Sequence, residues 1–362
     1  MNQILKRTIS FAACAILTTA IFPPAAMADE NGRDTTAVSL QNVYDLAYEN
    51  NISGKVADLN LKVLYKSIED ISDAVDATWD LFTDPSSSLY FTSSMNSLMS
   101  QQISRETKES TELSVESAKI QIGLGGQSLL LNCYALQNRY EELNASAEKL
   151  ERSLAVTRKM QEIGMATTDS VNALQQSETE LSSSIQALSN AIDTIKAKLG
   201  TYIGVPETQM VIAPFDGITA EEAESVIAAI DYDADLTLAH KNCYALKIQR
   251  LTVKNNSGNQ KKVEQLTLEA MEDDFPQAFK SAYLALKERA SALSDAENAY
   301  ALSSRDAETA ALKFDRGMIS KNSYLDSASQ QAFHKNALVS AQLDFYSSLY
   351  AYEAMTSGIW QQ

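Results

Sequence analysis

Proline is confined to a few places in this chain, and its distribution constrains the fold more than any other feature. Beyond Ala28 it occurs only at positions 85, 206, 214 and 276, so 86–205 and 277–362 contain none. Proline removes a backbone hydrogen-bond donor and interrupts helices, so its absence permits helices of unusual length. The sequence therefore predicts long helices in these two intervals rather than two or three ordinary globular domains.

Apolar residues in 122–154 and 171–199 recur at spacings of three and four. This seven-residue repeat is typical of a coiled-coil seam. Ile163 and Gly164 separate the two seams, and Glu178 is a charged residue at a seam position. Two seams joined by a short glycine turn predict an antiparallel helical hairpin. The seam positions are Ile122, Leu129, Cys133, Leu136, Tyr140, Leu143, Ala147, Leu150 and Leu154, then Val171, Leu174, Leu181, Ile185, Leu188, Ile192, Ile195 and Leu199.

The same arrangement returns near the C-terminus. An alanine-rich helical stretch from about Ala278 runs into a turn at Gly317 and continues to Gly358. The interval from Gly317 to Gly358 differs by a single position from the interval between Gly164 and Gly204 in the first hairpin. Such closely matching intervals indicate an internal duplication.

The two halves also begin alike, because the motif LAYEN at 46–50 is matched by LAHKN at 238–242. The interval between motif and turn glycine is shorter in the second half, and the missing part falls near 255–262. The chain is accordingly predicted to consist of a signal peptide, a first helical repeat, a connector with a short helix and a second, shorter repeat. These segments are 1–28, 29–205, 206–229 and 230–362.

The N-terminus has the layout of a secretory signal peptide. Lys6 and Arg7 precede an apolar run at 9–22, and small residues at 26–28 provide a cleavage site after Ala28. No later segment approaches the ~20 apolar residues of a membrane helix. Removing the signal peptide takes the formal charge from −17 to −19, which disfavours binding to nucleic acid and to anionic lipid. The sequence predicts an exported protein of the cell envelope.

No group of residues in the sequence points to catalysis, a cofactor or a metal. Cys133 and Cys243 fall within helical pattern and are predicted to be small buried apolar residues. The two histidines have no cysteine or histidine at metal-binding spacing. The acidic cluster at 272–274 lacks the alternation of a calcium loop and is interpreted as a solvated turn before Pro276. We therefore expect no enzymatic activity, no cofactor and no metal.

Taken together, these features resemble the TolC-like outer-membrane efflux proteins over nearly the whole mature chain. In that family each half opens with a helix of the type Thr/Ser-Leu-x-x-Ala-x-x-x-Ala-x-x-x-Asn, which 39–51 resembles. Each hairpin turns at a tip of the form Val-Gly-Leu followed by Ser or Thr, and IGMAT at 163–167 and RGMIS at 316–320 fit this form. A position that is commonly Asp in the family is Ser170 and Ser323 here.

The resemblance implies a fold, an assembly and a site. Each chain would be mainly all-α, with two repeated antiparallel coiled-coil hairpins that contribute to an α-helical barrel, and three chains would form a homotrimer. The hairpin tips would contact a periplasmic adaptor of an inner-membrane pump, and the protein would act as a passive efflux duct in the outer membrane and periplasm. The tip residues implied to dock the adaptor are Gly164, Met165, Thr167, Gly317, Met318 and Ser320.

The sequence departs from the family where the membrane strands should lie. Four strands are expected from each chain, and a spanning strand needs about 9–11 alternating residues. The chain offers only weak candidates at 86–100 and 119–126, and the corresponding stretch of the second half, 255–262, is short and polar. We therefore expect few or no β-strands and a reduced or absent membrane barrel, with membrane association left open. The alternative to a duct is a structural or interaction coiled-coil protein of the envelope that has lost the channel.

Overall fold

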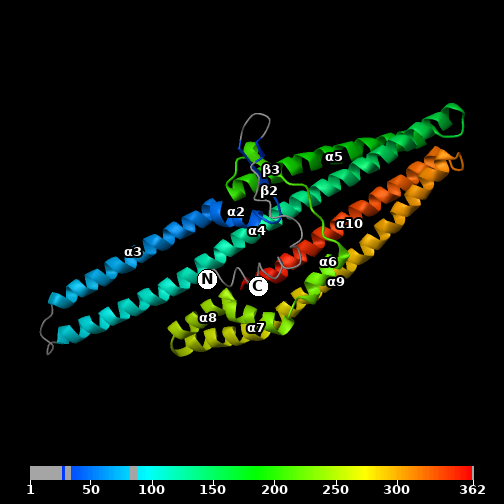
Figure 1. Cartoon of the computed structure of the whole chain (residues 1–362). Coiled ribbons are helices and arrows are strands. Elements are labelled where there is room, and N and C mark those ends of the chain that lie inside the picture. Colours follow the sequence, from blue (N-terminus) through cyan, green and yellow to red (C-terminus); the bar gives the residue numbers. More distant parts are fainter. Residues whose placement is uncertain (1–26, 29–33, 82–87, 361–362) are drawn as a thin grey trace.

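A computed structural model describes residues 27–28, 34–81 and 88–360. Nearly all of these residues are helical, and the long helices lie side by side (Figure 1). This confirms the predicted, mainly all-α fold with repeated hairpins and few strands. Most of the predicted signal peptide, 1–26, lies outside the described residues.

The two halves present their main helices in the same order. The first half has α2 Val43–Asn50, α3 Ile52–Leu81, α4 Ser88–Glu162 and α5 Thr168–Ile203. The second half has α7 Tyr232–Asn242, α8 Tyr244–Asn255, α9 Gly258–Asp315 and α10 Lys321–Thr356. Helices α8 and α9 have 12 and 58 residues, against 30 and 75 in α3 and α4. The residues that the second half lacks therefore fall in this helix pair and its loop.

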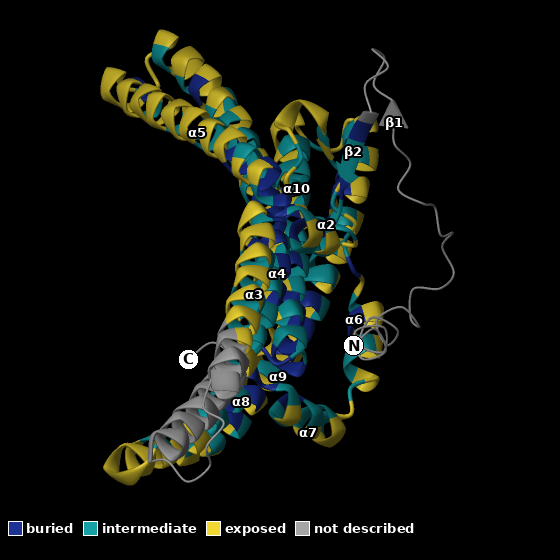
Figure 2. Cartoon of the chain, turned by 90° about the vertical axis from the view of Figure 1, so that its left-hand side faces the viewer, coloured by how far each residue is buried: buried dark blue, intermediate teal, exposed yellow. Residues whose placement is uncertain are grey.

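The helices form one curved layer. Helix α4 packs against α5 and α3, α10 packs against α9, and contacts of α4 with α10 and α8 join the two halves. At one end the hairpins α4–α5 and α9–α10 extend in the same direction, and at the other end α3–α4 and α8–α9 form two arms (Figure 1). Buried residues concentrate in the middle of the molecule, and the described residues toward both ends are mostly exposed (Figure 2).

A small sheet and a short helix cover the middle of this layer. Strand β2, Asp34–Val38, pairs in parallel with β3, Met210–Ile212, and antiparallel with β1, Met27–Ala28. The 3-10 turn Glu207–Gln209 precedes β3. Helix α6, Ala220–Ala228, begins with a capping box between Thr219 and Glu222, which satisfies backbone donors at its start.

The core consists of two main clusters, one in each half. In the first, α2 packs against α4 and α5 through fully buried side chains, including Val43, Leu130 and Leu199. In the second, α7, α9 and α10 surround an aromatic group that includes Phe275, Phe279 and Phe345. The opening helix of each half thus holds the two long helices of that half together.

The segment 119–126, a weak strand candidate in the sequence, lies within α4. Its glycines are explained by packing. A Cβ at Gly123 would lie 2.5 Å from the Tyr44 ring, and one at Gly126 would lie 2.7 Å from the Ala47 Cβ. The glycines therefore allow α2 to cross α4 closely, and the alternation in this segment does not produce a strand.

The interpretation of 272–274 as a turn before Pro276 is wrong, because α9 continues through the proline. Proline removes one helical hydrogen bond, which usually ends or kinks a helix. Here the flanking Phe275 and Phe279 are fully buried in the second core cluster. On the same helix, Glu272 accepts hydrogen bonds from Arg250 of α8, the shorter at 2.8 Å. Tertiary packing therefore overrides the local signal.

Candidate functional site

The first hairpin tip is a glycine turn that ends α4. Gly164 has a positive φ of 74°, which glycine tolerates without a steric penalty. The Met165 N–H donates to the Met160 carbonyl at 2.7 Å, and the Gly164 N–H donates to the Gln161 carbonyl at 2.9 Å. This pair of bonds is a Schellman motif, which satisfies carbonyls at the end of the helix.

The second tip repeats this geometry at the end of α9. Gly317 has a φ of 70°, the Met318 N–H donates to the Lys313 carbonyl at 2.8 Å, and the Gly317 N–H donates to the Phe314 carbonyl at 2.8 Å. The two turns predicted from sequence are therefore built alike, down to the hydrogen-bond pattern.

The residues after each glycine start the return helix. The Thr167 hydroxyl accepts from the Ser170 N–H at 3.2 Å and caps α5, and the Ser320 hydroxyl accepts from the Ser323 N–H at 3.1 Å and caps α10. Each cap hydroxyl also lies within 3.0 Å of the hydroxyl of the later serine. Ser170 and Ser323, which stand where the resembled family commonly has Asp, thus belong to the capping network.

Both tips present apolar side chains to solvent. Met165 and Ile163 are each 70% exposed, and Met318 is 69% exposed. A Cβ placed on Gly164 or Gly317 would meet nothing within 4 Å. Flexible, exposed methionines at the ends of two long helical hairpins form a surface suited to contact with another helix.

The closing glycines have a different environment from the tip glycines. Gly204 ends α5, and a Cβ on it would lie 3.0 Å from the Asn50 carbonyl oxygen. Gly358 follows α10, and a Cβ on it would lie 2.5 Å from the Asn242 carbonyl oxygen. The sequence showed these glycines and the LAYEN and LAHKN motifs as separate repeats. The structure brings each glycine against the end of the motif in its own half.

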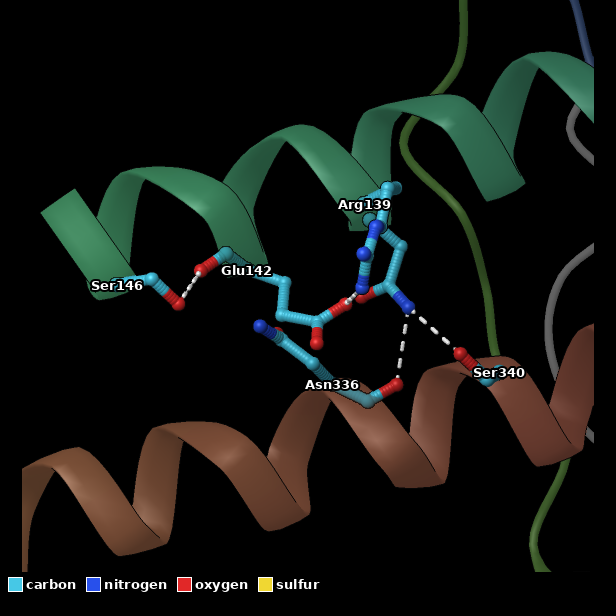
Figure 3. Close-up of polar contacts among 6 residues, drawn as sticks. Arg139, Glu142, Ser146, Asn336 and Ser340 are labelled. Atoms are coloured by element: carbon cyan, nitrogen blue, oxygen red, sulfur yellow. Dashed lines mark hydrogen bonds and ion pairs between the residues drawn. The ribbon is translucent and has the colours of Figure 1, made fainter. Parts of the chain in front are cut away.

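Helices α4 and α10 are joined by a buried polar contact (Figure 3). The Asn138 side-chain amide donates to the Asn336 carbonyl and to the Ser340 hydroxyl, each at 2.9 Å. Beside it, Arg139 pairs with Glu142 on the same face of α4. Because Asn138 is buried, this contact fixes the register of α4 against α10 and hence of the two hairpins. The coiled-coil pattern alone did not single out this residue.

A groove runs along α10 between α4 and α9. Its volume is about 900 Å³, and its lining mixes apolar side chains such as Tyr350 and Trp360 with polar ones such as Asn132 and Asp344. In the described part of the chain, no group of three or more His, Cys, Asp or Glu residues is arranged to hold a metal. Within the same residues, no helix combines the length and the apolar character needed to cross a membrane. Cys133 and Cys243 are free and buried, as predicted.

Comparison with known proteins gives a match in structure alone. No protein-family model matches the sequence, and neither does any curated protein. Among solved structures, the outer-membrane channel OprN matches with a TM-score of 0.54 at 13% identity, covering 89% of this chain and 91% of its own. The Campylobacter jejuni CmeC outer membrane channel gives a TM-score of 0.55 at 11% identity, covering 94% and 93%. A membrane protein from Pseudomonas aeruginosa gives 0.53 at 12%, covering 95% and 98%.

The curved layer of paired hairpins therefore has the fold of outer-membrane channels over nearly the whole length of this chain. It is the TolC-like fold that the sequence resemblance predicted.

Proposed function

We propose that this protein is the exit duct of an export system in the cell envelope. The observation that carries the proposal is the match to outer-membrane channels over about nine tenths of both chains. A duct of this kind is passive and performs no chemistry. Three copies, placed side by side, would close the curved layer into a tube located at the outer membrane and in the periplasm.

The hairpin tips are the proposed docking site for a periplasmic adaptor protein that belongs to an inner-membrane pump. Both tips lie at the same end of the molecule (Figure 1), so one partner surface reaches both. Gly164 and Gly317 set the turns, Thr167 and Ser320 cap the return helices, and the exposed Met165 and Met318 supply apolar contact. Repetition of the whole arrangement supports a role beyond ending two helices.

The docking proposal is tested in cells of the source organism with the double variant Met165→Asp, Met318→Asp. Because burying a carboxylate against an apolar partner is costly, we expect chemical crosslinking to the adaptor to fall at least about tenfold. Cells should also accumulate a fluorescent pump substrate as cells lacking the gene do. The matched control is Val211→Asp, which places the same charge on an exposed apolar residue of β3, away from the tips.

Unchanged crosslinking and unchanged dye accumulation in the double variant would show that the tips are plain turns. If deletion of the gene itself leaves dye accumulation at the wild-type level, the duct proposal fails and the structural role in the envelope replaces it.

A further inference from the structure

Helix α3 leaves a row of apolar side chains exposed. Ile52, Val56, Leu59 and Val63 are 47% to 68% exposed, although α3 also packs against α4 and α2. Their spacings of four, three and four residues are those of a coiled-coil seam. Four seam residues on one face of a helix, all turned to solvent, indicate a missing partner helix.

The row has a defined length. The next seam positions along α3 are Lys66, Asp70 and Asp73, which are charged and exposed. The apolar row thus spans 52–63, which is 12 residues, and α8 in the second half also has 12 residues.

Both helices start at equivalent places in their halves. At the start of α3, the Asn51 side chain donates to the Tyr202 carbonyl at 2.8 Å, beside the closing Gly204. At the start of α8, the Tyr244 N–H donates to the carbonyl of the closing Gly358 at 3.0 Å. The two arms extend toward the same end (Figure 1). The apolar row on α3 therefore reaches only as far as the shorter arm does.

The opposite edge of the layer carries a matching row. At this end α3 packs on α4, α4 on α8 and α8 on α9, so α3 and α9 are the outer helices. The first part of α9 exposes Val263 by 55%, Leu266 by 66% and also Ala270, at spacings of three and four. Each edge thus presents a short apolar seam at the same level of the molecule.

The two seams could pair in an antiparallel register, because helix α3 runs away from the middle of the molecule and α9 runs back toward it. Leu59 of one copy would then fall opposite Val263 of the next, and Val56 would fall opposite Leu266. Lys55 then lies near Glu269, an opposite charge that is also exposed. Lys62 and Lys262 meet at the outer end of the pair, where solvent screens their repulsion.

We infer that the 52–63 face of α3 is the docking surface for the α9 edge of a second copy of this chain. The inference rests on the proposed function, in which copies stand side by side. One edge meeting the opposite edge is a heterologous contact, which closes into a ring when the rotation between copies allows it. The arms of neighbouring copies then continue the helical wall through a region where the resembled family uses strands.

The test uses two full-length chains with different tags, one carrying Leu59→Cys and the other Val263→Cys, expressed together and treated with a short bismaleimide. A product containing both tags can form only between copies. We expect it to exceed by about tenfold the product of a control pair, Asp73→Cys with Val263→Cys. Asp73 is exposed on the same arm but lies beyond the reach of the short arm. The native Cys133 and Cys243 are buried and remain in place.

A second variant keeps the inference open to refutation if the cysteines disturb assembly. Leu59→Lys places a charge in the seam and should weaken assembly by about tenfold or more, with unchanged helical content. Asn60→Lys, exposed one residue further along α3, should assemble as the wild type does. Equal crosslinking in both pairs, or normal assembly of Leu59→Lys, overturns the inference. If wild-type chains assemble but fail these tests, only the inference falls; if wild-type chains stay monomeric, the proposed duct falls with it.

Discussion

At the scale of single residues, the positive-φ glycines at the hairpin tips differ from those that follow α5 and α10. The tip glycines, Gly164 and Gly317, have open space where a side chain would be, whereas a Cβ on Gly204 or Gly358 would press on the backbone of the opening helix. Each of these four glycines ends a helix, and the sequence does not show that they differ in packing. Only the tertiary contacts show that the closing glycines are also packing residues.

This difference predicts unequal costs for the same substitution. Gly317→Ala should cost only the strain of a left-handed alanine, about 1–2 kcal/mol. Gly358→Ala should cost at least roughly 2 kcal/mol more, because its Cβ would meet the Asn242 carbonyl oxygen at 2.5 Å. Urea unfolding of both variants measures the difference. Equal losses of stability would mean that α7 can shift to accept a methyl group at no cost.

Glu353 on α10 is a partly buried carboxyl whose burial raises its pKa to about 7. For an acid, a folded-state pKa above the unfolded value of 4.5 means that ionisation opposes folding. The contribution of Glu353 to the free energy of unfolding is therefore most favourable below about pH 4.5. That contribution is lost as pH rises through 7, with a limit of roughly 3 kcal/mol.

Glu353→Gln should remove this penalty. We expect the variant to be more stable than the wild type at pH 8 and nearly equal to it at pH 4.5, in urea unfolding at both values. Glu308→Gln, at an exposed position of α9, serves as the control and should show no such pH dependence. An equal gain at both pH values would attribute the effect to packing rather than to charge.

At the scale of elements, α9 shows how packing decides where a helix ends. Pro276 is a strong local signal for a boundary, yet the helix extends from Gly258 to Asp315 around two fully buried phenylalanines. A similar override occurs in α4, where glycines that weaken a helix locally serve the crossing with α2. Both corrections to the sequence analysis arise from contacts between helices.

Pro276→Ala should restore the missing donor to the Glu272 carbonyl and raise stability by about 1–3 kcal/mol. The melting temperature by circular dichroism, at unchanged helical content, is the measurement. Gln277→Ala, at the adjacent exposed position, should change stability by less than about 0.5 kcal/mol. A fall in melting temperature for Pro276→Ala would mean that a bend at the proline is needed to seat Phe275 and Phe279.

At the scale of the whole molecule, the curved layer has unsatisfied edges. Exposed leucines follow α9 at 284, 302 and 312, in addition to the seams on both arms. A layer that is open at both edges and exposes apolar side chains on both is expected to close on copies of itself. This expectation concerns the assembled molecule and is independent of what passes through it.

We expect residues 29–362 to have the native mass of three chains in light scattering. A trimer that forms only in detergent would indicate a duct inserted in a membrane, and a trimer without detergent would indicate a helical tunnel that assembles in water. A single-chain mass under both conditions would contradict the trimer and favour a structural role in the envelope.

By itself the sequence determined the length of the return helix in each hairpin, the positions of the tips and the correspondence of the two halves. These properties depend on local features, namely helical periodicity, the absence of proline and glycine turns at matching distances. Residues near one another in the chain are sufficient to specify them.

Only the tertiary structure decided the rest. The helical state of 119–126 depends on α2, the continuity of α9 on buried aromatic residues, and the register of α4 against α10 on Asn138. The placement of exposed seams on the two outer edges likewise depends on the order of the helices in the layer. These features join residues far apart in the chain, where local propensity carries no information and burial in the folded molecule determines the outcome.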